Sequence, residues 1–438
     1  MTLAERVREA GVVGAGGGGF PTYVKLSARA EVVIANGAEC EPLLHKDAAL
    51  MELRAAELVR GLLLAMEAVG AREGIIGIKA KNRGAVEAVE AARRGTPVRI
   101  HLLGDYYPAG DEYDLVYAAT GRLIPPGGIP LQVGVVVCNV ETLINVAAAA
   151  EGRPVTCKTL TVAGAVRSPV TLTVPLGTTF REALEAAGGP TTSDPVLCVG
   201  GVMMGETTDD LGTPILKTTA GVVVLPRTHP LIQRKLRPAA AQNAVGKAAC
   251  DQCRYCTEYC PRYLLGYPVE PHQVMRSLAF TATGEAFWSS WGVLCCACGL
   301  CTLYACPEQL YPKEACDQAK ALMQRSGRKW DRPVTVRPHP MRDGRRVPIR
   351  SLVRRLQLEA YDQPASWVQG ALRPSRLVLP LKQHAGAPCQ PLVRPGERIR
   401  AGQPIGAVPQ GALGCPVHAP VDGRVVSVGA DIVVEPIP

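Results

Sequence analysis

The first 150 residues alternate between short apolar runs and amphipathic segments. The apolar runs predict buried strands at Glu31–Ala35, Gly74–Lys79, Val98–Leu102 and Val133–Cys138. Helical periodicity predicts helices at Ala48–Val69, Arg83–Arg94 and Glu141–Ala150, with a loop rich in Tyr, Pro and Gly at 104–130. Such alternation is typical of a parallel, doubly wound sheet, so residues 1–153 are expected to form a Rossmann-like α/β domain.

A different pattern covers residues 154–228. Two alternating strands, Thr159–Ala163 and Val170–Val174, surround a turn. A short helix, Phe180–Ala187, leads to strands at Val196–Val199 and Val222–Leu225. This order predicts a β-grasp module. Its residues carry no obvious chemistry, so we interpret it as a structural spacer.

A proline-rich linker, Pro333–Pro340, opens the segment 327–376 and precedes a basic amphipathic helix. One apolar stripe joins Ile349, Leu352, Val353 and Leu356, and arginines occupy the other faces. Such a helix either docks on an acidic partner or packs on its own protein, and we favour packing.

Short strands and turns fill residues 377–438. VRPGERIRAGQPIG and VHAPVDGRVVSV resemble a biotinyl- or lipoyl-type barrel-sandwich hybrid. The last lysine, Lys382, lies outside the hairpin turn where a carrier lysine would stand. The absence of that lysine favours a packing role over a swinging arm.

Composition narrows the class of protein. The 438 residues are 47% hydrophobic and 20% charged, as in soluble globular proteins. No uninterrupted apolar run is long enough for a membrane span, and the net charge of +9 is too diffuse to predict nucleic-acid binding. The start, MTLAERVREAG, lacks the apolar core of a secretory signal, so a cytoplasmic location is expected.

Half of the sixteen cysteines fall in two tight runs. The first run is CDQCRYCTEYCP, and the second has C-x2-C-x2-C-x4-C-P spacing. The predicted metal ligands are Cys250, Cys253, Cys256, Cys260, Cys295, Cys298, Cys301 and Cys306. Each run is typical of a [4Fe–4S] site, whereas zinc sites use separated C-x2-C pairs. Residues 229–326 are therefore expected to form an α-helical dicluster ferredoxin-like domain in a reducing compartment.

The fourth ligands of the two clusters are expected to be exchanged, as in two-cluster ferredoxins. One cluster would take Cys250, Cys253, Cys256 and Cys306. The other would take Cys295, Cys298, Cys301 and Cys260. Cys296 lies beside a ligand but does not keep the spacing.

Three polar turns of the first domain are expected to converge. A glycine-rich loop lies within Gly11–Leu26 and is followed by Lys25, while the turns Asn36–Pro42 and Asn139–Thr142 follow predicted strands. Glycines let backbone N–H groups approach a flat or anionic ligand, and strand carboxyl ends are where α/β sheets bind ligands. Taken alone, the loop could equally be a flexible turn and the acidic turn a helix cap.

The motifs in these three turns carry a specific family resemblance. GGGGFPT, NGAECEP and NVETL, in this order, resemble the flavin-binding subunit of respiratory complex I and, still more, the RnfC component of the Rnf complex. The resemblance implies a complex I-type domain binding non-covalent FMN. The residues that would surround the flavin are Gly14, Gly16, Gly17, Lys25, Asn36, Asn139 and Thr142. Glu39 and Glu41 would lie near the isoalloxazine and the incoming nicotinamide, as catalytic residues. Ala15 departs from the complex I pattern, in which an arginine is common, and the acidic loop that helps to hold NADH is not recognisable.

The module order distinguishes branches of this family, because the barrel precedes the flavin domain in the RnfC component and comes last here. That order resembles the cobalamin reductases of propanediol-utilising microcompartments. The resemblance implies that NAD(P)H delivers electrons through FMN and two [4Fe–4S] clusters to a corrinoid, reducing cob(III)alamin or cob(II)alamin. It also implies an adenosyltransferase and a microcompartment shell protein as partners. The alternatives are another acceptor, as in Rnf or the proline reductase carrier, or a cluster-bearing adaptor that does not oxidise NADH.

Overall fold

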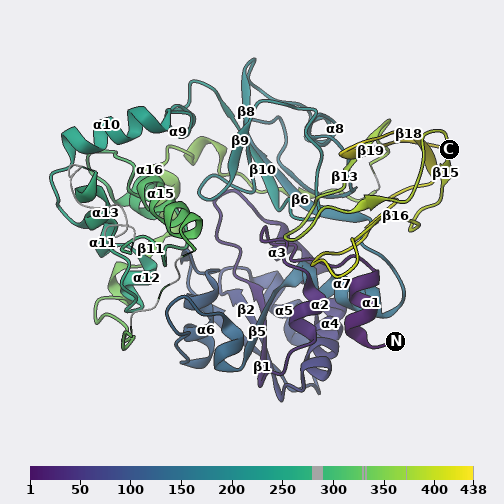
Figure 1. Ribbon diagram of the computed structural model, residues 1–438, viewed down its shortest axis with the longest axis horizontal. Coiled ribbons are helices and arrows are strands. Elements are labelled where there is room, and N and C mark those ends of the chain that lie inside the picture. Colours follow the sequence, from purple (N-terminus) through teal and green to yellow (C-terminus); the bar gives the residue numbers. More distant parts are fainter. Residues whose placement is uncertain (279–289, 328–329, 331–332, 371, 438) are drawn as a thin grey trace.

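Four modules and a connecting segment make up the molecule. The computed structural model describes residues 1–278, 290–327, 330, 333–370 and 372–437. In Figure 1 the N-terminal module lies at the bottom, the β-grasp module at the top, the helical cysteine-rich module at the left and the C-terminal barrel at the right. The N-terminal module and the β-grasp module face each other across the centre of this view.

The N-terminal module is a parallel sheet with helices on both faces, as predicted. Its strand order is β3-β2-β1-β5, and every pairing is parallel. The strands are β1 (Val32–Gly37), β2 (Glu73–Lys79), β3 (Val98–Leu103) and β5 (Val135–Asn139). One face packs on α1 (Leu3–Glu9), α2 (Thr22–Leu26), α3 (Lys46–Leu53), α4 (Ala55–Val69), α5 (Arg83–Ala92) and α7 (Val140–Ala150). The other face packs on α6 (Glu112–Thr120). Burial on both faces explains why these strands are continuously apolar.

Two details of this module differ from the prediction. The expected helix Ala48–Val69 is two helices, because Arg54 leaves helical geometry at φ −129° and ψ 33°. The expected loop at 104–130 contains β4 (Tyr106–Tyr107), the 3-10 turn η1 (Pro130–Val133) and α6. Asp111 caps α6 by accepting from the N–H groups of Tyr113 and Asp114, a start signal that the surrounding Pro and Gly residues obscured.

The β-grasp module has six strands in the order β12-β7-β6-β10-β8-β9. Its elements are β6 (Cys157–Gly164), β7 (Val170–Pro175), α8 (Phe180–Ala186), β8 (Pro195–Val199), β9 (Glu206–Thr208) and β10 (Gly221–Pro226). The edge strand β12 (Ser366–Trp367) comes from the connecting segment and pairs in parallel with β7. This pairing fastens the connecting segment to the module.

Short helices carry the two cysteine runs. They are α9 (Pro230–Lys235), α10 (Ala239–Ala249), α11 (Tyr255–Glu258), α12 (Pro261–Leu264), α13 (Pro271–Ser277), the π-helical turn η2 (Cys301–Ala305) and α15 (Pro312–Arg325). The connecting segment then forms η3 (Asp343–Arg345), β11 (Val347–Pro348), α16 (Ile349–Arg355) and η4 (Glu359–Tyr361).

The basic helix α16 packs on its own protein. Leu352 and Val353 are buried in a core that also contains Val223 of the β-grasp module and Leu303 of the cysteine-rich module. Strand β11 pairs with β4 of the N-terminal module. The packing interpretation of the amphipathic stripe is confirmed.

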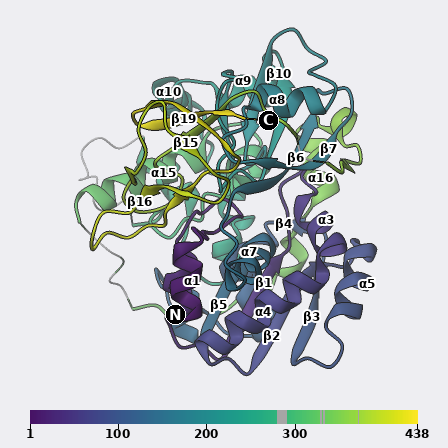
Figure 2. The ribbon, with the colours of Figure 1, turned by 90° about the vertical axis from the view of Figure 1, so that its right-hand side faces the viewer.

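The C-terminal barrel consists of two small sheets, ordered β13-β19-β18-β15 and β14-β16-β17. Its strands are β13 (Leu377–Pro380), β14 (Gln390–Pro391), β15 (Arg398–Ile399), β16 (Pro404–Ala407), β17 (Val417–His418), β18 (Gly423–Val428) and β19 (Asp431–Pro436). Figure 2 shows these strands above α1. Barrel residues Leu379 and Ile405 share one core with Val12 and Leu26, so the first and last modules are packed as one body.

Candidate functional site

A cavity of about 410 Å³ lies where the N-terminal module meets the β-grasp module. It opens at the carboxyl ends of β1 and β5, the position at which parallel α/β sheets bind ligands. Gly200, Met204 and Ala220 close it from the β-grasp side. The three predicted turns converge here, and the volume is that of a small-molecule site.

The glycine loop presents bare backbone to this cavity. Gly14, Gly16, Gly18 and Gly19 line it, whereas Gly17 is not among the lining residues. Within the described chain, the N–H groups of Gly16, Gly17 and Gly18 donate to no protein acceptor. Consecutive backbone donors without a protein acceptor can bind an anion such as a phosphate. The loop therefore fits the phosphate-bearing end of a flavin nucleotide.

Thr142 and Asn139 fix the position of this loop. The Thr142 hydroxyl accepts from the Ala15 N–H at 2.9 Å. A Cβ atom on Gly16 would lie 3.2 Å from Nδ2 of Asn139, so a larger residue here would make a tight contact and require this side chain to shift slightly. Asn139 also caps α7 by accepting from the Glu141 N–H at 3.0 Å.

Lys25 and Asn36, both expected beside the flavin, line the same cavity. The Lys25 ammonium donates to the Val137 carbonyl at 2.8 Å and lies 3.6 Å from the Glu112 carboxylate. The Asn36 amide donates to the Gly110 carbonyl at 2.9 Å, and its oxygen accepts from the Ala38 N–H. Asn36 thus holds the cavity wall formed by the segment before α6.

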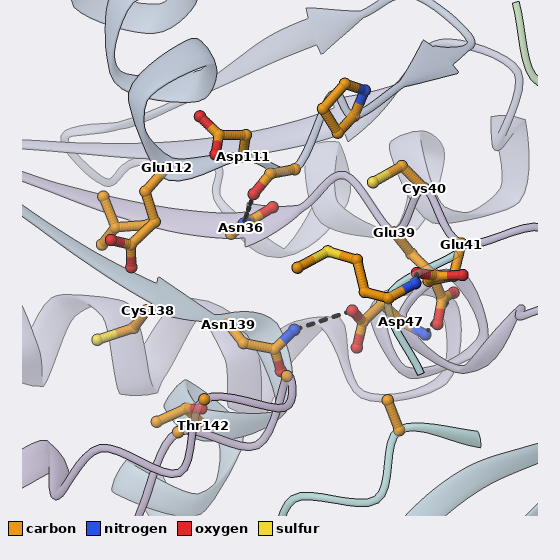
Figure 3. A pocket seen from close by; sticks show the side chains of 18 of the residues that line it. Asn36, Glu39, Cys40, Glu41, Asp47, Asp111, Glu112, Cys138, Asn139 and Thr142 are labelled. Atoms are coloured by element: carbon orange, nitrogen blue, oxygen red, sulfur yellow. Dashed lines mark hydrogen bonds between the residues drawn. The ribbon is translucent and has the colours of Figure 1, made fainter. Parts of the chain in front are cut away.

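The two predicted catalytic glutamates differ in their surroundings (Figure 3). Both line the cavity. Both oxygens of Glu41 are taken by backbone N–H groups, of Met203 at 2.9 Å and Met204 at 2.8 Å, and burial raises its pKa. Glu39 accepts from the Asp47 N–H, and burial followed by repulsion from the Asp47 carboxylate raises its pKa to about 8. With its pKa raised in this way, Glu39 holds its proton more readily than an ordinary glutamate and can donate or share it.

Asp47 connects the cavity to a buried ionic network. Its carboxylate accepts from Asn139 at 2.8 Å and pairs with the Lys46 ammonium. Lys46 reaches Glu141 at 3.1 Å, and Glu141 also pairs with Lys158 of β6. Although burial opposes it, the Lys158 and Lys46 charges hold the pKa of Glu141 below its usual range.

Lys158 extends this network from the β-grasp module to the glycine loop. Its ammonium donates to the Ala15 carbonyl at 2.7 Å, while the Thr159 N–H donates to Glu141 at 3.0 Å. Burial lowers the pKa of Lys158 to about 8. A residue of the second module thus holds the backbone of the cofactor loop.

The cavity also touches the second cysteine run. Cys296 and Cys298 line it, and the Tyr107 hydroxyl donates to the Cys298 carbonyl at 2.7 Å. Asp111, another lining residue, pairs at 2.8 Å with Arg262, which lies two residues after Cys260. The candidate flavin site and the second run therefore share a wall.

The first-run thiols gather around a small pocket of their own. Its lining includes Cys250, Cys253, Cys256 and Cys306, the set expected for one cluster with an exchanged fourth ligand. Burial, followed by the neighbouring thiolates of Cys306, Cys250 and Cys253, raises the pKa of Cys256 to about 12.

The second set is also brought together. Burial and the charges of Cys296 and Cys295 raise the pKa of Cys260. The ionisable neighbours of Cys301 include Cys295 and Cys260 of its own set and Cys256 of the first set. In the described residues, no group of three or more His, Cys, Asp or Glu side chains is placed to hold a metal ion, so the individual ligands stay predictions.

Several lining residues escaped the sequence prediction. Cys40, Asp47, Asp111, Glu112 and Cys296 all face the cavity. Asp111 could have been found from its helix-capping position before Glu112 and Asp114. For Cys296 the ligand spacing gave no signal, because only the fold brings the second run to this cavity.

Four family profiles match the chain. The Nuo51 FMN-binding domain matches residues 7–148, and the SLBB domain matches residues 159–207. A 4Fe-4S dicluster domain matches residues 249–311, and the RnfC barrel-sandwich hybrid domain matches residues 362–436. These matches confirm the predicted module types and support FMN and iron–sulfur clusters as cofactors.

Similar proteins fall into two groups. The chain is 43% identical over 434 residues to "Cobalamin reductase PduS" of Salmonella typhimurium, covering 97% of this chain and 94% of the relative. It is 35% identical over 264 residues to the RnfC component of the proton-translocating ferredoxin:NAD(+) oxidoreductase complex of Clostridium ljungdahlii, covering 59% of this chain and 55% of that relative.

A solved NAD⁺-reducing [NiFe]-hydrogenase in its H2-reduced state is 22% identical, with a TM-score of 0.49 over 75% of this chain and 67% of that chain. Among the described helices, none combines the length and the apolar character needed to cross a membrane.

Proposed function

The chain belongs to the family of the cobalamin reductase PduS, and on this basis we propose that it transfers electrons from NADH, through FMN and two [4Fe–4S] clusters, to a corrinoid. It is an oxidoreductase with an FMN-binding domain and a 4Fe-4S dicluster domain. The observation that carries the proposal is the shared wall of the cavity, where the glycine loop and the second cysteine run meet. A flavin bound there would lie beside Cys298, a predicted cluster ligand.

The residues of the cavity have distinct roles in this proposal. The free N–H groups of Gly16 and Gly18, together with Lys25, bind the FMN phosphate. Thr142 and Asn139 hold the loop in register through Ala15 and α7. When bound, FMN accepts two electrons as a hydride and can release them singly, which is the chemistry that the protein itself lacks.

The two glutamates divide between proton handling and positioning. Glu39 lines the cavity with a raised pKa, so it supplies or holds a proton near the ring. Glu41, with both oxygens on backbone donors, positions the Met203–Met204 turn against the cavity. This assignment refines the expectation that both act catalytically.

The family resemblance also implies two protein partners and a location in the cell, which we include in the proposal. The corrinoid product would pass to an adenosyltransferase, and a shell protein would hold the chain in a bacterial microcompartment of the cytoplasm. The supporting observation is likeness along almost the whole chain to a cobalamin reductase.

Anaerobically reconstituted protein tests the central claim. NADH is expected to bleach the visible absorbance of bound flavin and then to convert cob(II)alamin to cob(I)alamin, followed by its absorbance. If NADH does not bleach the flavin, the chain is an adaptor and the dehydrogenase claim fails. If bleaching occurs but only another acceptor is reduced, the corrinoid claim fails.

A further inference from the structure

An open groove of about 790 Å³ lies on the cysteine-rich module, apart from the flavin cavity. One wall is the segment from Arg227 through α9 to the start of α10, and the other is the turn Pro307–Gln309 with Tyr311. Pro307, Glu308 and Gln309 are exposed and follow directly after Cys306. The groove is thus lined by the chain that carries a predicted ligand of the first-run cluster.

The groove and the first-run thiols lie on two sides of one backbone segment. Leu310 lines the thiol pocket, while its neighbours Gln309 and Tyr311 line the groove. The Leu310 N–H donates to the Cys306 sulfur at 3.3 Å, and the Leu310 carbonyl accepts from Arg234 at 2.9 Å. Of the eight predicted ligands, Cys253 is exposed and Cys250 of the same set is half-buried, whereas Cys256, Cys306 and all four members of the second set are buried. The first set is therefore the one that an external molecule can approach.

Arginines dominate the charge of the groove. Arg227 is neutralised by Asp194 and Asp209. Arg234 donates to the Thr302 and Leu310 carbonyls and lies over the Tyr311 ring, which fixes its charge in the wall. The Arg237 guanidinium is exposed, and no ion pair joins it to any residue that the structure describes. Glu308 is the acidic lining residue.

Apolar surface lies beside these charges. Leu236, next to Arg237, keeps 43% of its surface exposed, and Pro230, Pro238 and Pro307 also line the groove. A ligand that combines an amphiphilic face with an anionic group would match this mixed lining. A corrinoid has this combination, because its nucleotide loop carries one phosphodiester beside a large macrocycle.

We propose that this groove is the docking site for the corrinoid acceptor, with Arg237 receiving its nucleotide phosphate. The inference rests on the proposed function and specifies where that function delivers electrons. It places acceptor and NADH on separate surfaces, one beside the first thiol set and one at the flavin cavity.

The test uses the full, reconstituted protein and two corrinoids. Hydroxocobalamin binding to the oxidised protein, followed by equilibrium dialysis, is expected to weaken about tenfold in Arg237→Glu, because a charge-assisted contact is lost. Cobinamide lacks the nucleotide phosphate and should bind wild type and Arg237→Glu equally. Leu236→Gln should weaken binding of both corrinoids.

Matched controls distinguish a loss of corrinoid binding from a general effect of the substitution on the protein. Arg400→Glu reverses an exposed charge on the barrel and should leave corrinoid binding unchanged. Bleaching of the bound flavin by NADH should be equal in wild type, Arg237→Glu and Arg400→Glu, since the flavin cavity is untouched.

The possible failures are distinguishable. If wild type reduces cob(II)alamin and Arg237→Glu binds hydroxocobalamin as tightly, the groove assignment is overturned and the function stands. If cobinamide binding weakens as much as hydroxocobalamin binding, the phosphate contact is wrong. If wild type neither binds nor reduces a corrinoid, the proposed function fails and the acceptor assigned to the groove fails with it.

Discussion

Lys158 and Glu141 form the buried ion pair on which the cofactor loop rests. Each is almost fully excluded from solvent, and Glu141 is shared with Lys46. In this network two cations, Lys46 and Lys158, balance two carboxylates, Glu141 and Asp47. Removing one member leaves an uncompensated buried charge, which costs far more than the pair contributes.

We therefore expect Lys158→Met to lower the free energy of unfolding by about 3–5 kcal/mol and to weaken FMN binding. The double variant Lys158→Met/Glu141→Gln restores charge balance and should recover much of this loss. Urea unfolding and flavin fluorescence titration measure the two effects. Equal stability of the single and double variants would show that the network carries no such charge coupling.

Glu39 gives the molecule a pH-dependent stability. Its pKa rises from 4.5 unfolded to about 8 folded, so the folded state binds the extra proton between these values. Stability from this group is full below pH 4.5 and is lost as pH rises through about 8. Glu39→Gln should match wild type near pH 5 and exceed it near pH 8 by on the order of 2 kcal/mol, since the open cavity screens part of the effect. Denaturant unfolding of both proteins between pH 5 and pH 8 measures this difference. If the free energy of unfolding changed with pH equally in both, Glu39 would not be the source of the pH dependence.

Single cysteine substitutions test which predicted ligands share a cluster. Cys253→Ala and Cys306→Ala should lose the same cluster, lowering iron from about eight to about four atoms per chain, while Cys260→Ala loses the other. Electron paramagnetic resonance distinguishes the two clusters. Exposed Cys157→Ala is the control and should retain full iron. If Cys306→Ala removed the same cluster as Cys260→Ala, the exchanged pairing would be wrong.

At the scale of elements, α16 and β12 attach the connecting segment to the modules around it. The helix fills a core between three modules, and the strand extends the β-grasp sheet. The sequence predicted α16 and its buried stripe from periodicity alone. It could not predict β12, because a two-residue strand has no period and its partner β7 lies almost 200 residues away.

Leu352→Ala should lower the free energy of unfolding by about 2–5 kcal/mol, because Leu352 has no exposed surface and truncation leaves a cavity. Arg354→Ala, on the exposed side of the same helix, should change it by less than about 0.5 kcal/mol. Chemical unfolding of both variants measures the difference. If Leu352→Ala changed the free energy of unfolding only slightly, the packing of α16 would not be what holds the modules together.

At the scale of the whole molecule, the barrel completes the N-terminal core. Lys217 of the β-grasp module donates to the Gly11 carbonyl at 2.8 Å and to the Pro416 carbonyl at 2.9 Å, joining three modules. Module types were predictable because each has its own periodicity or cysteine spacing. Their arrangement was not, since it depends on side chains such as Lys217 that show no pattern in the chain.

The shared core predicts coupled unfolding. Leu379→Ala in the barrel should lower the temperature at which flavin is released from the N-terminal module, whereas exposed Val426→Ala should not. FMN at about 100 times its Kd should add about 2.7 kcal/mol to the free energy of unfolding of wild type and of each variant. Flavin fluorescence and near-ultraviolet circular dichroism should change in one transition. Separate transitions would show that the barrel is an independent unit.

The contact between the glycine loop and the barrel also orders events during synthesis. The Ala385 N–H donates to the Gly19 carbonyl at 3.0 Å, so the glycine loop contacts residues that are translated much later than the loop itself. Ribosomes add about 5–20 residues per second, and the early module must wait for the barrel to emerge before its loop is braced. We therefore expect a ribosome-bound chain that stops before residue 377 to bind FMN more weakly than the full chain, because its glycine loop lacks this contact.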